Sequence, residues 1–197
     1  APNPEVLSVE LGTDDFAQAG TVLSNDPHGP RCDLWYLLDA DISTGTNTIK
    51  VTWDGEAGRR GIGGICFYNA KQSSFLSNFN AQTTSHATDG NVAGNVTPTT
   101  TGSAIVDGMA DISGSATRTH NRTAGWTQFI GGNDRGQGSQ YDLSPTIGSA
   151  NAMTYTLGSA AGWGWVGGEI RCETDNASSV NLPNGATFLT SDTNKLY

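Results

Sequence analysis

Apolar residues recur at every second position in several short stretches of this chain. Met153, Tyr155 and Leu157 alternate with small or polar residues. Side chains two residues apart point to the same face of a β-strand, so this pattern indicates a strand with one buried face and one face in water.

The same alternation predicts strands along much of the remaining chain. The clearest is Thr48–Trp53, in which Ile49, Val51 and Trp53 share one face. The other ranges predicted as strands are Glu5–Leu11, Phe16–Leu23, Asp33–Asp39, Gly61–Asn69, Ser103–Ile112, Thr127–Ile130 and Ser139–Leu143.

An apolar stretch with Trp163, Trp165 and Ile170 follows the strand around Tyr155, after the short segment Gly-Ser-Ala-Ala-Gly. Two strands joined by a short Gly-containing segment are typical of an antiparallel hairpin. We therefore predict a hairpin over Asn151–Cys172.

The character of the chain changes between Ala70 and Gly102, where Gln, Ser, Thr, Asn and Gly dominate. Such a long polar segment is typical of a functional loop or of a loop packed on the surface. We expect a long loop here, directly after a central strand at Gly61–Asn69.

The composition favours an all-β fold. The 197 residues include 26 Gly and 7 Pro, and each Gly inside a helix costs about 1 kcal/mol relative to Ala. Short strands separated by Gly and Pro turns are typical of a two-layer antiparallel jelly-roll sandwich. We expect one sandwich domain with long polar loops over residues 1–172, and a tail over 173–197 that forms an edge strand or an exchanged strand.

The charge excludes some classes of partner. The formal net charge is −9 at pH 7 and the cations are scattered, whereas nucleic-acid binding needs clustered Lys and Arg. The sequence has no apolar run of the ~18–20 residues that a membrane-spanning helix requires. An acidic surface rich in Thr and Asn suits a protein outside the cell.

Three cysteines allow at most one internal disulfide. Cys66 lies in the apolar stretch GICFY, where we expect it to be a small buried hydrophobe. Cys32 and Cys172 both flank predicted strands, and the sequence leaves open whether they pair or remain thiols.

The carboxylates do not form a recognisable catalytic pattern. Asp107 and Asp111 lie on one predicted strand and Glu169 follows an aromatic strand, without the Glu-centred triplet expected of a sandwich glycosidase. The chain also lacks the Gly-x-Ser-x-Gly motif of a nucleophile elbow. We interpret these carboxylates as turn and edge residues and expect no enzymatic activity.

Calcium is the one metal that the sequence suggests, and we expect no other cofactor. Asp39 and Asp41, followed by Ser43, place oxygen ligands at alternate positions, as the first half of an EF-hand loop does. The sixth position is Thr44 and the twelfth is Lys50, which breaks that motif. A different calcium geometry that uses Asp39 or Asp41 stays open.

A glycan site would need an exposed aromatic ring beside amide or carboxylate side chains. Trp126 is the best candidate platform, with Asn133 and Asp134 in the GGND loop and Tyr141 beyond it. Trp163 and Trp165 are explained at least as well by core packing.

The successive motifs DLWYLLD, STGTNTIKVTW, GIGGICFYN, SAIVDGMAD, TQFIGG and NAMTYTLGSAAGWGWVGGEI form a recognisable series. Their order resembles the concanavalin-A-like, LamG-like jelly-roll family of phage virion and bacterial surface proteins. The resemblance covers about Asp33 to Ile170 and rests on structural glycines and core aromatics. The chain departs from the family in its short segment before Asp33 and its long tail after Cys172.

What this resemblance implies is a non-enzymatic structural, decoration or adhesion role, sometimes with glycan contact. We therefore expect a structural or surface-display protein of a virion (a capsid decoration, tail or fibre component) or of another extracellular assembly. Its partners would be copies of itself or other assembly subunits. The alternative is a lectin-like carbohydrate-binding module for surface glycans, with or without Ca²⁺. A hydrolase using Glu169 or Asp107 ranks third.

Overall fold

The computed structural model of the chain is all-β, as the sequence predicts. It describes residues 5–23, 30–45, 48–55, 61–74, 76–84, 90–113, 118–122, 124–129, 136–172 and 189–190. One short 3-10 helix, η1 (Asp39–Asp41), accompanies the strands. In the part of the chain so described, no helix has the length and hydropathy needed to cross a membrane.

The largest sheet has five antiparallel strands in the order β11-β12-β9-β14-β7. Their bounds are β7 Leu76–Thr84, β9 Ala104–Asp111, β11 Ala124–Phe129, β12 Gly136–Asp142 and β14 Trp163–Ile170. All eight residues of β14 are buried. This interior strand is therefore covered on both faces.

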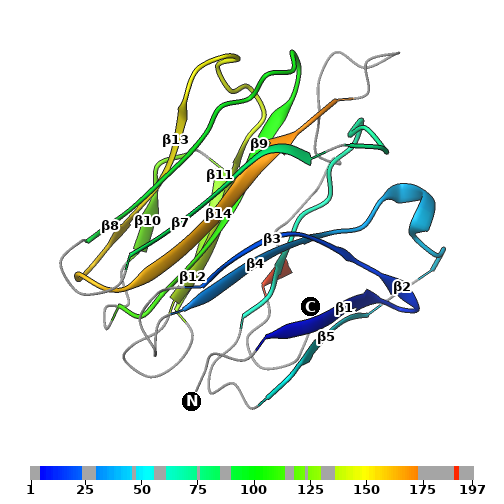
Figure 1. The fold of residues 1–197 in the computed structure, drawn as a ribbon, viewed down its shortest axis with the longest axis horizontal. Coiled ribbons are helices and arrows are strands. Elements are labelled where there is room, and N and C mark those ends of the chain that lie inside the picture. The colour runs from blue at the N-terminus through cyan, green and yellow to red at the C-terminus, as the bar shows by residue number, and fades with distance from the viewer. Residues whose placement is uncertain are drawn as a thin grey trace.

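A three-stranded sheet, in the order β10-β13-β8, packs against one face of the five-stranded sheet (Figure 1). Its strands are β8 Asn91–Val96, β10 Arg118–His120 and β13 Asn151–Leu157. The main core lies between the two sheets and combines apolar side chains from β8, β9, β13 and β14. Every second residue of β13 is buried, because one face of the strand packs on this core and the other is in contact with water.

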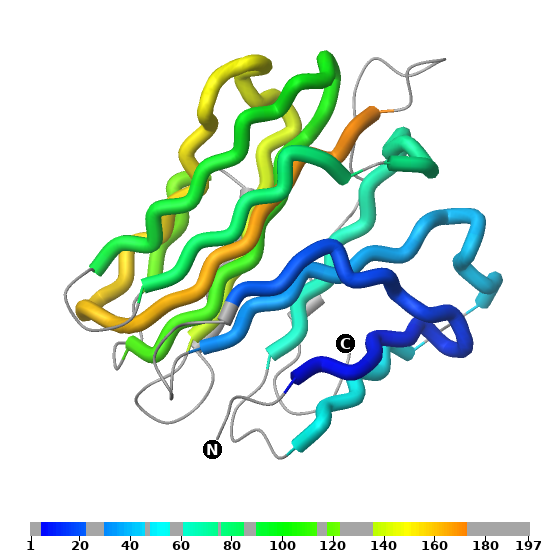
Figure 2. The backbone as a smooth tube through the Cα atoms, viewed as in Figure 1, coloured from blue at the N-terminus to red at the C-terminus, as the bar shows by residue number. Residues whose placement is uncertain are grey.

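Two smaller sheets lie beside the opposite face of the five-stranded sheet (Figure 2). One is the pair β3 (Ala17–Leu23) and β4 (Arg31–Tyr36), and the other has the order β2-β1-β5, with β1 Val6–Leu11, β2 Asp14–Asp15 and β5 Ile49–Trp53. A Cβ placed at Gly164 of β14 would lie 3.0 Å from Val22, and one at Gly108 of β9 would lie 3.4 Å from the Cys32 sulfur. Strands β3 and β4 therefore cover β14 and β9 on this side.

The hairpin predicted over Asn151–Cys172 is wrong in its pairing, although both strands exist. β13 pairs with β8 and β10, whereas β14 pairs with β9 and β7. The two strands face each other across the core, so that Tyr155 and Trp165 meet between the sheets. A period of two identifies which face of a strand is buried, but it does not identify the neighbour along its edge.

The long loop predicted over Ala70–Gly102 is also wrong, because β7 and β8 lie within it. In β8, Val92, Gly94 and Val96 face inward and alternate with exposed residues. The central strand predicted at Gly61–Asn69 is reduced to β6 (Gly63–Gly64). β6 pairs with β15 (Leu189–Thr190), which is the part of the predicted tail that the structure describes.

The cysteines correct one expectation and answer one question that the sequence left open. Cys66 is exposed, not a buried hydrophobe. Cys32 and Cys172 are free thiols. Cys32 lies against Gly108, which pairs with Val166, and Cys172 lies six residues beyond Val166. At about 3.3 Å per residue the two cysteines are about 20 Å apart along the strand, far beyond disulfide reach.

Candidate functional site

A network of buried polar groups surrounds Asp107 in the middle of β9. Its carboxylate accepts hydrogen bonds from the Tyr155 hydroxyl at 2.5 Å and from the indole Nε1 of Trp165 at 2.6 Å. Gln140 donates to it twice, from its backbone N at 3.0 Å and from its side-chain Nε2 at 3.2 Å. These four residues come from β9, β12, β13 and β14, so the Asp107 network joins both sheets.

Burial controls the protonation of this network. Each of its four side chains exposes at most 1% of its surface. Burial raises the pKa of Asp107 from 3.8 to about 7. The hydrogen bonds from Tyr155, Trp165 and Gln140 lower the pKa, but burial is the larger effect. Burial and the adjacent carboxylate also raise the pKa of Tyr155 well above 10, so the phenol keeps its proton.

Two glycines make room for the Trp165 indole. A Cβ at Gly94 of β8 would lie 2.1 Å from the indole Cε2, and one at Gly167 would lie 2.6 Å from its Cζ2. Neither the indole nor the facing strands can move far inside a packed core. The absence of a side chain at both positions therefore lets the indole lie between the sheets and reach Asp107.

A buried ion pair forms a second polar centre at the end of β9. The Arg118 guanidinium donates from Nε to one oxygen of Asp111 and from Nη2 to the other, each at 2.7 Å. The backbone N of Ser113 also donates to Asp111 at 2.7 Å. Gly136 leaves the space that Arg118 occupies, because a Cβ there would lie 1.9 Å from Nε.

Glu169 of β14 is the third centre and has no exposed surface. It accepts hydrogen bonds from the Ser77 hydroxyl at 2.9 Å, the Thr100 backbone N at 2.8 Å, the Thr99 hydroxyl at 3.3 Å and the Asn78 side chain. Burial alone would raise its pKa, but hydrogen bonds from the Thr99 and Thr100 backbone and from the Ser77 and Ser103 side chains outweigh burial and lower the pKa to about 2.

A register shift between β7 and β14 builds the Glu169 centre. The shift falls between Gly167 and Glu169, and Asn78 has a positive φ of 48°, which Asn tolerates better than most residues. Such a bulge redirects neighbouring side chains. Here both Ser77 and Asn78 reach Glu169.

The interpretation of these carboxylates as turn and edge residues is therefore wrong. Asp107, Asp111 and Glu169 are buried on β9 and β14, the two strands at the centre of the five-stranded sheet. Each is held by several hydrogen-bond donors, as a buried carboxylate requires. The sequence shows that these residues lie on strands, but not which donors from neighbouring strands, loops and the opposite sheet surround them.

One recess among the described residues is a cavity of about 260 Å³, called here the interlayer cavity. It lies between the β2-β1-β5 sheet, strand β4 and the outer face of β9 and β12. Apolar residues of β1 and β5 line one side, among them Val9 and Val51, and Arg31, Asp33 and Trp35 line it from β4. Sequence reasoning missed this recess, although the alternation of the three β4 residues indicates that they share one face.

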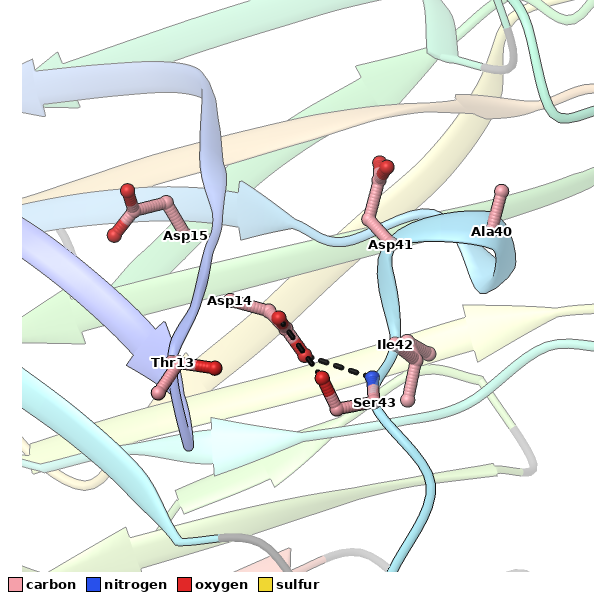
Figure 3. A pocket seen from close by; sticks show the side chains of 7 residues that line it. All are labelled: Thr13, Asp14, Asp15, Ala40, Asp41, Ile42 and Ser43. Carbon is pink, nitrogen blue, oxygen red and sulfur yellow. Dashed lines mark hydrogen bonds between the residues drawn. The ribbon is translucent and has the colours of Figure 1, made fainter.

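A second recess is a shallow hollow of about 520 Å³ beside the predicted calcium residues (Figure 3). Asp14, Asp15 and Asp41 are among its lining residues. Asp14 accepts hydrogen bonds from the Ser43 backbone N at 2.7 Å and hydroxyl at 3.1 Å, and these bonds lower its pKa. Figure 3 shows the carboxylates of Asp15 and Asp41 directed away from this contact.

The hollow does not assemble a metal centre. Asp39 and Asp41 are exposed in η1. Within the described ranges, no three His, Cys, Asp or Glu side chains form a group that could hold a metal ion. Calcium binding by Asp39 and Asp41 stays a prediction from the sequence.

The predicted glycan residues are only partly placed. Trp126 lies on β11, whose side chains are outside the described part, and Asn133 and Asp134 also fall outside it. Tyr141 is half-buried and meets Phe67 edge to face, with ring centroids 6.3 Å apart. Its ring belongs to a small apolar cluster on the outer face of the sheet, which makes it a poor platform for a sugar.

Comparisons of the chain with family models, with curated proteins and with solved structures found no match. The resemblance to concanavalin-A-like jelly rolls consequently stays a prediction from the sequence.

Proposed function

We propose that this chain is a non-enzymatic structural or surface-display protein, a jelly-roll sandwich on the exterior of a virion or cell. The observation that supports this proposal most is that the three buried carboxylates all bind groups of the protein itself. Asp107 joins four strands from two sheets, Asp111 holds Arg118 of the opposite sheet, and Glu169 ties β14 to β7 and to the loop at Thr99–Thr100. All three hold the framework together.

These carboxylates are poorly suited to catalysis. A glycosidase needs two carboxylates on either side of a substrate in an open cleft. The oxygens of Asp107, Asp111 and Glu169 instead face donors of the protein itself, and their side chains are closed off from solvent. A network saturated in this way favours rigidity and a unique packing of the two sheets.

Open strand edges supply the means of assembly in this proposal. Among the described residues, β8 pairs only with β13, and β5 only with β1. Such edges present unpaired backbone groups to which another strand can add. Leu7 on β1 is 58% exposed and adds apolar surface beside one of these edges.

Light scattering coupled to size exclusion, over a range of protein concentrations, tests the assembly. We expect a defined oligomer that Ala93→Lys on β8 weakens, because an edge charge opposes strand addition. Leu7→Lys on β1 should also weaken it, because it places a charge on the exposed apolar surface beside the β5 edge. Thr156→Lys, at an exposed position of β13, is the matched control for added charge. A chain that stays monomeric at every concentration contradicts self-assembly.

A polysaccharide panel tests the absence of catalysis. We expect no turnover of any glycan by the purified chain. Turnover that follows the protein through successive purification steps contradicts the proposal.

A further inference from the structure

The interlayer cavity has a largely apolar wall made by two paired strands. Val9 of β1 is opposite Val51 of β5, and Val6 is opposite Trp53, in the antiparallel register. All four line the cavity, as does Ile49. Water inside such a space gains few hydrogen bonds, so an apolar occupant is favoured there.

The charged groups of the lining are already paired. Arg31 donates from Nε to both oxygens of Asp33, at 3.1 and 2.9 Å, and from Nη2 to Glu5 at 3.4 Å. Asp33 also accepts from Gln18 at 3.1 Å. Burial raises the pKa of the Cys32 thiol, which therefore stays neutral. An ionic ligand would have to break these pairs, whereas a neutral one would not.

The lining also holds one polar group without a partner. The indole Nε1 of Trp35 is buried and has no hydrogen-bond partner in the structure, and Trp35 lines the cavity. The hydroxyl of Ser139, on the floor of the cavity, is in contrast engaged with the Asp107 carbonyl at 2.5 Å. A buried donor left unpaired destabilises the folded state, and an acceptor in the cavity would remove that cost.

From these observations we infer that the interlayer cavity is a binding site for a small, neutral, largely apolar molecule that carries one hydrogen-bond acceptor. The acceptor, a carbonyl or ether oxygen, takes the Trp35 N–H, and the apolar body packs against the β1–β5 wall. This binding activity is separate from the structural role proposed above and does not depend on it.

The volume limits the size of the ligand. An apolar cavity of about 150 Å³ can hold benzene, and liquid water occupies about 30 Å³ per molecule. The 260 Å³ of the interlayer cavity therefore suits a molecule of roughly nine non-hydrogen atoms. Acetophenone and cumene are suitable probes, because they have nearly the same shape and only acetophenone has an acceptor oxygen.

Titration of the ¹⁵N-labelled full chain with each probe, followed by NMR of the tryptophan indoles, tests the site. We expect acetophenone to shift the Trp35 indole signal, assigned by its loss in Trp35→Phe, more strongly than cumene does, because only acetophenone can accept from the indole N–H. In Trp35→Phe, followed through the Trp53 indole, the affinity for acetophenone should fall about three- to tenfold relative to that for cumene, because only acetophenone loses a hydrogen bond.

Val51→Phe is the second variant, because its larger ring fills the cavity while leaving Trp35 in place. We expect it to abolish the shift by both probes, and Tyr68→Phe, at an exposed position outside the cavity, to leave binding unchanged. Three results would overturn the inference: no shift by either probe, a ratio of the two affinities that Trp35→Phe leaves unchanged, or binding that survives Val51→Phe.

Discussion

Replacing Asp107 by Asn should change how the stability of this protein depends on pH. The pKa of Asp107 is about 7 in the folded chain and 3.8 in its ordinary environment. The folded state therefore holds this proton more tightly than the unfolded state does. Its contribution to stability is fully present below about pH 4 and is lost as the pH rises through about 7.

The magnitude follows from that difference. A pKa unit corresponds to about 1.4 kcal/mol, so the loss between pH 4 and pH 8 amounts to about 4 kcal/mol for a fully buried group. The amide that Asp107→Asn introduces does not titrate. It can donate to the Tyr155 oxygen but cannot accept from the Gln140 backbone N on the same side, which costs about 1–3 kcal/mol at all pH values.

Urea unfolding of both proteins at pH 4, 6 and 8, followed by tryptophan fluorescence, measures the effect. We expect Asp107→Asn to be less stable than the native chain at pH 4 and equally or more stable at pH 8. Taking the difference between the two proteins removes the contribution of every other titrating group. A difference that is constant within about 1 kcal/mol from pH 4 to pH 8 would refute the reasoning.

Three further predictions concern the other buried groups. Glu169→Gln should lower the free energy of unfolding by about 2–4 kcal/mol near neutral pH. It should also abolish the loss of stability that Glu169 causes as the pH falls from 4.5 through about 2. An acid titration followed by circular dichroism would detect this difference. Gly94→Ala should lower the free energy of unfolding by about 1–3 kcal/mol or prevent folding, because its Cβ would lie 2.1 Å from the Trp165 indole. Gly90→Ala, on the same side of the sandwich, is the control. Its Cβ would make only an ordinary contact at 3.7 Å, and it should cost under about 1 kcal/mol in the same urea assay. Arg118→Met should lower the free energy of unfolding by about 3–5 kcal/mol, because it leaves the Asp111 carboxylate buried and without its ion-pair partner. In a double-mutant cycle, adding Asp111→Leu should restore part of that loss. Additive losses would contradict a direct interaction between the two side chains.

The faces of the strands could be predicted from the sequence better than their partners. Met153, Tyr155 and Leu157 are buried as the alternation predicts, because the period depends only on local backbone geometry. Which strand lies alongside β13 depends on contacts between residues far apart in the chain. A short Gly-rich connection is compatible with a hairpin and equally with a crossing between two sheets. The pairing of β13 and β14 could therefore not be predicted from the residues that connect them.

Strand β8 was hidden for a different reason. Val92, Gly94 and Val96 do alternate with exposed residues, but a glycine facing the core carries no hydrophobic signal. Its role is defined by Trp165, which comes from the opposite sheet. The buried carboxylates were missed for a similar reason. A polar residue on a strand is expected to be exposed unless hydrogen-bond donors that satisfy it inside the protein are known.

The crossing of the chain from β13 to β14 has a consequence for folding. Consecutive strands here lie in different sheets, and β14 finds its neighbours β7 and β9 only after long loops have closed. Closing those loops costs entropy before any pairing compensates for it, so such topologies fold on the scale of milliseconds to seconds. Strand β14 can reach its final position only when its distant partners are present, and the two sheets should therefore form together in one cooperative step.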